Sequence, residues 1–126
     1  MLAWILTLAL VIPVGIAQAA DLDKARELFL SGEYETSLKE LSGYLGKAAT
    51  DDERGRAHFL AGNNYMQLQL YDDARQAFEK SLAAKSSLGA YAFYELGHAY
   101  LKLERYKDAR LALERVGYFR PPNELR

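Results

Sequence analysis

The feature that most constrains the fold is a set of residues that recurs at an interval of 35 positions (97 − 62 = 35). The recurring pairs are glycines, tyrosines, alanines and large apolar residues: Gly62 and Gly97, Tyr65 and Tyr100, Tyr71 and Tyr106, Ala74 and Ala109, and Phe78 and Leu113. A fixed interval of this size with several matched positions indicates a repeat array, in which neighbouring units bury apolar faces that no unit buries alone.

Within the last unit, the apolar residues follow helical spacing in two stripes separated by a short polar step. The first stripe contains Phe93, Leu96, Gly97 and Tyr100. The second follows Glu104–Arg105 and contains Tyr106, Ala109, Ala112, Leu113 and Val116, and Pro121 ends the pattern. Two such stripes predict an antiparallel helical hairpin. Because glycine inside a helix costs about 1 kcal/mol relative to alanine, we expect the second helix to cross closely over Gly97, opposite a small residue such as Ala109.

These slots resemble the tetratricopeptide repeat family, whose unit reads W-x2-L-G-x2-Y, then A-x3-F, then P. The last unit matches as Phe93-x2-Leu96-Gly97-x2-Tyr100, Ala109-x3-Leu113 and Pro121. The middle unit keeps the Gly, Tyr, Ala and Phe slots and departs at His58, Ala61 and Ser86. A degenerate copy from Asp21 to Leu45 places Ala25, Leu28, Tyr34, Ser37 and Leu41 in the matching slots. The resemblance covers roughly residues 21–121 and implies an all-α array of about three helical hairpins, a right-handed α-solenoid.

The expected helices follow from the stripes and the turn residues between them. They are Asp21–Ser31, Tyr34–Leu45, Asp51–Leu68, Tyr71–Ala84, Leu88–Leu103 and Tyr106–Gly117. The resulting domain spans residues 20–120, with repeats at about 21–46, 54–87 and 89–120, and residues 121–126 form a tail.

Residues 1–19 have the pattern of a signal peptide. Leu2–Ile12 is apolar, Pro13 and Gly15 interrupt it, and Ala17-Gln18-Ala19 has the small-x-small form of a cleavage site. We therefore expect cleavage between Ala19 and Ala20 and export to the periplasm. The alternative is an uncleaved anchor in the inner membrane, because residues 2–20 approach the roughly 20 residues that span a bilayer. In that case the N-terminal segment is the protein's only contact with the membrane.

Composition excludes several classes of function. The 126-residue chain contains no cysteine, so thiolate metal sites and cysteine nucleophiles are excluded. Its formal net charge of −1 argues against nucleic acid as a partner. His58 and His98 are the only histidines, and the sequence contains no phosphate-binding, dinucleotide-binding or zinc-protease motif. The sequence therefore predicts a protein that is not an enzyme and that carries no cofactor or metal.

The resemblance also implies a binding surface, because the first helix of each tetratricopeptide hairpin lines a concave face. On that face we expect Arg56, Phe59, Asn63, Met66, Gln67, Tyr91, Tyr94, His98, Leu101 and Lys102, extended by Arg26 and Phe29. Family members that clamp a peptide C-terminus need a lysine where this chain has Phe59, so that mode of recognition is not expected. Aromatic residues and methionine beside an asparagine and a few bases suit a peptide or helix with apolar anchors.

These observations predict a scaffold or adaptor of the periplasm or cell envelope that binds another protein or peptide. Alternatives are the N-terminal module of a longer envelope assembly protein and a glycan-binding or enzyme-associated regulatory module. Charge runs along the chain: residues 21–53 carry nine acidic and four basic residues, whereas residues 102–126 carry seven basic and four acidic ones. A solvated surface explains such a gradient. The alternatives are head-to-tail self-association, which an uncapped last repeat favours, and an acidic partner that docks at the basic end.

Overall fold

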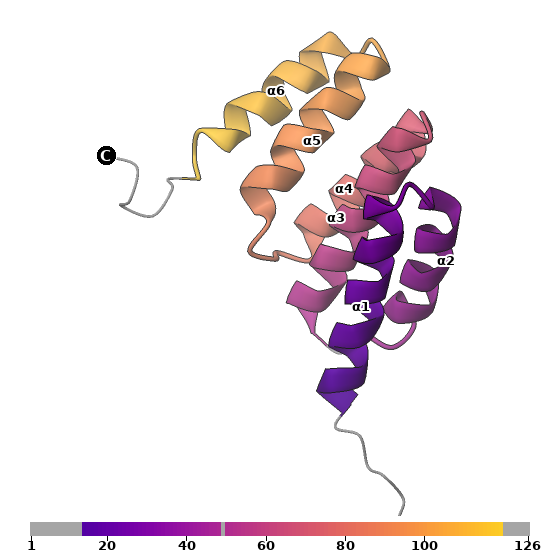
Figure 1. Cartoon of the computed structure of the whole chain (residues 1–126). Helices are drawn as coiled ribbons and strands as arrows, with labels where there is room; N and C mark the ends of the chain where they lie inside the picture. Colours follow the sequence, from indigo (N-terminus) through magenta and orange to yellow (C-terminus); the bar gives the residue numbers. More distant parts are fainter. Residues whose placement is uncertain (1–13, 49, 120–126) are drawn as a thin grey trace, which may run out of the picture.

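The computed structural model describes residues 14–48 and 50–119, and side chains from Leu22 onward. This part of the chain consists of six helices: α1 (Val14–Leu30), α2 (Tyr34–Leu45), α3 (Asp51–Gln67), α4 (Tyr71–Ala83), α5 (Gly89–Lys102) and α6 (Tyr106–Val116). Consecutive helices pack as three hairpins, α1 with α2, α3 with α4 and α5 with α6, stacked in chain order (Figure 1). The predicted all-α repeat array is confirmed.

Five helices lie within one residue of their predicted bounds at each end, and the first begins earlier than predicted. Helix α1 begins at Val14 instead of Asp21 and includes Ala17–Ala20, the predicted cleavage region. The alanine-rich sequence there has high helix propensity, which explains the longer helix. The apolar segment Leu2–Ile12, Pro13, Pro121 and the tail lie outside the described residues. None of the described helices combines the length and the apolar character needed to span a membrane.

The three hairpin turns share one geometry. Gly32, Gln69 and Glu104 have positive φ angles of 78°, 59° and 59°. The following residue in each turn donates its backbone N–H five residues back, from Glu33 to Leu28, from Leu70 to Tyr65 and from Arg105 to Tyr100, each at 2.9 Å. This is the Schellman ending of a helix, which favours glycine at the left-handed position. The repeat interval thus places an identical turn at the end of each first helix.

Each of the last two hairpins closes over a glycine, as expected for Gly97. A Cβ atom on Gly97 would lie 2.6 Å from the Leu113 side chain and 3.5 Å from the Ala109 carbonyl oxygen. A Cβ atom on Gly62 would lie 2.5 Å from the Phe78 ring. Glycine at these two positions therefore permits the helices of a hairpin to approach closely.

Two apolar clusters form the core, one on each side of α3 and α4. The first contains Ala25, Leu41, Tyr44, Ala57, Ala61 and Ala77. The second contains Ala74, Phe78, Leu96, Ala99 and Ala112. Tyr106, which was predicted to lie on the packing stripe of α6, is 64 % exposed, because no helix of the described chain packs beyond the third hairpin.

A buried polar chain joins the first three helices. The amide of Asn64 donates to the Ser37 hydroxyl at 2.9 Å, and Ser37 donates to the Ala25 carbonyl at 2.7 Å. All three residues are fully buried. Because a buried polar group without a partner is costly, these bonds fix how α1, α2 and α3 pack together.

Candidate functional site

The first helices of the three hairpins line two adjoining depressions. One has a volume of about 690 Å³ and is lined by Phe29, Asn63, Met66, Gln67, Gln69, Tyr71, Tyr94, Glu95, His98 and Lys102. The other has a volume of about 220 Å³ and is lined by Leu22, Arg26, Arg56, Phe59, Leu60, Asn63 and Leu88. Asn63 borders both, so we describe them together as the α1–α3–α5 groove.

Eight of the ten predicted groove residues line this groove. They are Arg56, Phe59, Asn63, Met66, Gln67, Tyr94, His98 and Lys102. Arg26 and Phe29, predicted as an extension, also line it. Their role in binding remains a prediction.

Tyr91 and Leu101 were predicted for the groove, and neither lines it. Tyr91 is 64 % exposed. It precedes Tyr94 and His98 on α5 by one and two turns and borders neither depression. Leu101 lies toward the far side of α5, where it lines a separate apolar pocket with Tyr106, Ala109 and Leu113 of α6. The prediction took all residues of the first helices that lie outside the packing stripe. These residues lie on both sides of the stripe, and only one side faces the groove.

The structure adds groove residues that the prediction missed. Leu22, Leu60 and Glu95 come from α1, α3 and α5, Gln69 and Leu88 from inter-helix turns, and Tyr71 from the start of α4. Tyr71 recurs as Tyr106 in the repeat, but Tyr106 lines the α5–α6 pocket, so the recurrence does not predict a groove position. The turn residues carry no signal either, since their direction depends on the left-handed backbone at Gln69.

The exposed aromatic centre of the groove is Tyr94. Its side chain is 49 % exposed, and its ring packs against the edge of His98 with centroids 4.5 Å apart. Met66 and Phe29 lie in the same depression and are partly buried. This arrangement offers an apolar contact surface with polar groups at its border, as binding hot spots do.

Phe59 differs from Tyr94, although the repeat places the two in the same slot. The centroid of its ring lies 5.8 Å from that of Phe78, and it packs against the second core cluster, whose buried residues come from α4, α5 and α6. This packing predicts that Phe59 contributes to the stability of the fold as well as to the groove. It serves as a wall of the groove and as part of the core.

Arg56 is held in place by ion pairing. Its Nε donates to Asp52 at 2.7 Å, and its terminal nitrogen donates to the Ser87 hydroxyl at 3.2 Å. Asp52 in turn accepts from the backbone N–H of Ser87 at 3.1 Å. The Ser87 N–H, followed by Arg56, holds the pKa of Asp52 below its usual value. This cluster ties the α4–α5 connection to α3 and fixes one end of the groove.

The charges of the groove are mostly positive. Arg26 and Arg56 lie in one depression and Lys102 in the other, whose lining carries one acid, Glu95. The Lys102 amine lies 6.0 Å from the centroid of the Tyr71 ring. A ligand that combines an apolar group with a negative charge therefore matches the groove.

The groove offers noncovalent contacts. Among the described residues, no three histidine, aspartate or glutamate side chains lie close enough together to hold a metal ion. The histidine of the groove, His98, contacts an aromatic ring instead.

Comparison with known proteins agrees with the helical array. A family model described as tetratricopeptide repeat matches residues 19–88 and again residues 59–124, and the two matches together cover most of the chain. No curated protein matches the sequence.

Proposed function

Because the chain belongs to the tetratricopeptide repeat family, we propose that it is a scaffold that binds a peptide segment of another protein in the α1–α3–α5 groove. Repeats of this family mediate protein–protein interaction. In this proposal the protein has no catalytic role.

The observation that carries the proposal is the exposure of Tyr94 inside a groove bordered by cations. An aromatic ring that is half exposed beside Met66 and Phe29 gains contact area when an apolar side chain covers it. Lys102 lines the same depression as Tyr94, Arg26 lines the adjoining one, and both suit acidic residues that flank the apolar anchor. The ligand class is therefore an acidic peptide with an aromatic or aliphatic anchor.

The test is selection from a display library of random peptides, followed by affinity measurement with the peptides that are enriched. We expect enriched peptides to share an apolar residue next to an acidic one. Tyr94→Ala is expected to weaken their binding by about tenfold or more, as for an aromatic hot spot. Tyr91→Ala is the matched control, since Tyr91 is an exposed tyrosine of the same helix that lies outside the groove.

Two outcomes contradict the proposal. In one, Tyr91→Ala and Tyr94→Ala weaken binding equally, so the groove is not the site. In the other, oligosaccharides displace the peptides or bind where no peptide does. This result favours the glycan-binding alternative, in which Tyr94 stacks on a sugar ring.

We also propose that the protein acts in the periplasm after export. The support is the uncharged, apolar stretch Leu2–Ile12 followed by the small-x-small sequence Ala17–Ala19. Anchoring in the inner membrane by residues 2–20 is the alternative. A second proposed partner is another copy of the chain, bound through the uncovered face of the last hairpin, and sedimentation of the purified chain tests it.

A further inference from the structure

The two junctions between neighbouring hairpins are filled differently. At the second junction, where α4 meets α5, Phe78 and Leu96 are buried and Phe93 packs against the same cluster. At the first junction, where α2 meets α3, the corresponding slots hold Leu41, Ala61 and His58, the last two lying 35 positions before Leu96 and Phe93. Each replacement is smaller than the residue it matches.

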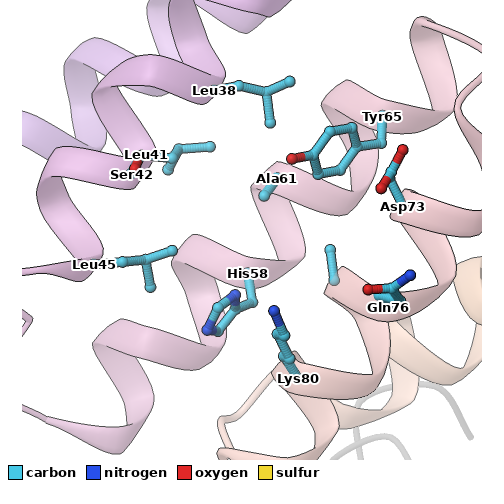
Figure 2. Close-up of a pocket in the computed structure, with 11 residues that line it drawn as sticks. Leu38, Leu41, Ser42, Leu45, His58, Ala61, Tyr65, Asp73, Gln76 and Lys80 are labelled. Atoms are coloured by element: carbon cyan, nitrogen blue, oxygen red, sulfur yellow. The ribbon is translucent and has the colours of Figure 1, made fainter.

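The smaller side chains leave a pocket at the first junction. Its volume is about 230 Å³, and its lining comes from α2, α3 and α4: Leu38, Leu41, Ser42, Leu45, His58, Ala61, Tyr65, Asp73, Gln76, Ala77 and Lys80 (Figure 2). The pocket shares no residue with the α1–α3–α5 groove. Since an apolar cavity of about 150 Å³ accommodates benzene, this pocket has room for a ring with one substituent.

The walls are apolar and the two ends are polar. Leu38, Leu41 and Leu45 face Ala61 across the pocket, as Figure 2 shows. His58 and Lys80 lie at the end near Leu45, whereas Tyr65 and Asp73 lie at the end near Leu38.

The end near Leu45 is positively charged. Burial, followed by the charges of Lys80 and Arg54, lowers the pKa of His58. Lys80 forms no ion pair with any residue that the structure describes. Asp73 lies seven residues before Lys80 on α4, which is about 10 Å along a helix, so it leaves this end open to another anion. From α2 the lining includes no titratable group.

We propose that this pocket binds a small organic acid with an apolar body. Its ring or chain occupies the space that Phe93 and Leu96 fill at the second junction, and its carboxylate contacts Lys80 and His58. The same chemistry occurs in a free aromatic acid and in the C-terminal phenylalanine of a peptide. The binding is independent of the proposed peptide groove, because the two sites share no residue.

The experiment titrates the isotope-labelled full chain with phenylacetate, with the neutral phenylacetamide, and with N-acetyl-alanyl-phenylalanine as a peptide source. Backbone and His58 imidazole resonances are followed by NMR. We expect phenylacetate to shift resonances of Leu41, Ala61 and Lys80 and to raise the pKa of His58, because the carboxylate favours the imidazolium. Binding of the acetylated dipeptide but not of its C-terminal amide identifies the peptide source, and binding of phenylacetate alone identifies the free acid.

Two variants separate the apolar from the charged contribution. The double change His58→Phe with Ala61→Leu installs the residues of the second junction, so it is expected to fill the pocket and abolish binding. Lys80→Met is expected to weaken phenylacetate binding by about tenfold or more, as for loss of a charge-assisted hydrogen bond, and to leave phenylacetamide binding unchanged. His98→Phe is the control, because His98 lies in the groove.

The proposal is overturned if phenylacetate shifts only groove residues such as Asn63 and Tyr94, or if it shifts none. It is also overturned if Lys80→Met binds phenylacetate as tightly as the parent does. Lys80 is exposed, so its replacement leaves the fold intact and keeps this test valid even where the double variant unfolds.

Discussion

The hydroxyl of Tyr100 donates a hydrogen bond of 2.9 Å to the Glu79 carboxylate, which joins α5 to α4 across the second junction. The guanidinium of Arg105 lies over the Tyr100 ring, 4.8 Å from its centroid, so the same tyrosine also makes a cation–π contact. The first junction lacks this pair, since Ser42 occupies the slot on α2 that corresponds to Glu79 on α4. The two junctions therefore use different polar links: the second has the Tyr100–Glu79 bond, and the first has the buried bond from Asn64 to Ser37.

Removing that hydroxyl is expected to weaken the second junction. Tyr100→Phe deletes the bond to Glu79 and should lower the free energy of unfolding by about 1 kcal/mol, measured by chemical denaturation at neutral pH. Tyr106→Phe is the matched control, because Tyr106 is an exposed tyrosine at the start of α6. Equal loss in the two variants contradicts the assignment of Tyr100 as the link between the hairpins.

The same contact makes the free energy of unfolding depend on pH in the alkaline range. Burial, followed by the bond to Glu79, raises the pKa of Tyr100 above its usual value. A folded-state pKa above the unfolded value means that the stabilisation is complete below the unfolded pKa, about 10, and is lost as pH rises through the folded pKa. The difference in stability between the parent and Tyr100→Phe is therefore expected to shrink above about pH 10. Denaturation at pH 8 and at pH 10.5 measures it, and a constant difference contradicts it.

The close approach at Gly97 predicts a large effect of any side chain there. Gly97→Leu places atoms where Leu113 already lies, and overpacking of this kind costs about 1–3 kcal/mol. We expect a lower melting temperature by circular dichroism. Glu104→Gln is the control and should melt like the parent, since the equivalent turn position already holds Gln69 in the same left-handed conformation. Identical melting of both variants and the parent contradicts the role of Gly97.

Glycine is expected to stabilise the turns that currently lack it. Gln69 and Glu104 have the positive φ that Gly32 adopts in the first hairpin, and a left-handed residue other than glycine costs about 1 kcal/mol. Glu104→Gly should therefore raise the melting temperature. Arg110→Gly, inside α6, should lower it, because glycine there weakens the helix by about 1 kcal/mol. A loss of stability in Glu104→Gly contradicts the turn geometry.

The sequence predicted the fold closely because its repeat fixes the turns. In each repeat, a residue with a left-handed backbone ends the first helix, followed by the turn to the second helix. Gly62 and Gly97 lie where the two helices of their hairpins approach most closely. The start of α1 was not predicted. The residues around Ala17–Ala19 fit both a cleavage site and a helix, and the prediction assigned them to the signal peptide alone. Helical spacing alone could not separate Tyr91 from Tyr94, because their exposure depends on where the neighbouring hairpin lies.

The pocket at the first junction was not predicted, although its signal is in the sequence. His58 is one of the positions where the middle unit departs from the family pattern, and in the structure it lines a pocket. Comparison of His58 and Ala61 with Phe93 and Leu96 shows the loss of volume. Smaller side chains leave a pocket only if α2 does not pack closer to α3 in compensation. The distance between the two helices depends on many residues, so no single position predicts it.

Export is testable by mass. If Ala17–Ala19 is cleaved, intact-mass analysis of the chain expressed in a Gram-negative host should give a soluble product that begins at Ala20. A membrane-bound product that retains Met1–Ala19 establishes the anchor instead. Ala17→Arg with Ala19→Arg is the control, because bulky charged residues at both small positions block cleavage and should leave the precursor uncleaved.

The unequal roles of Phe59 and Tyr94 give the last prediction. Tyr94→Ala should leave circular dichroism and melting nearly unchanged, because Tyr94 is half exposed and contacts His98 at the surface. Phe59→Ala should lower the free energy of unfolding by about 2 kcal/mol or more, since its ring packs on Phe78 and deletion of a large core side chain typically costs about 3–5 kcal/mol when fully buried. Phe59→Leu keeps most of the apolar volume and should recover most of that stability. If Tyr94→Ala unfolds and Phe59→Ala stays stable, the assignment of Phe59 to the core and of Tyr94 to the surface is wrong.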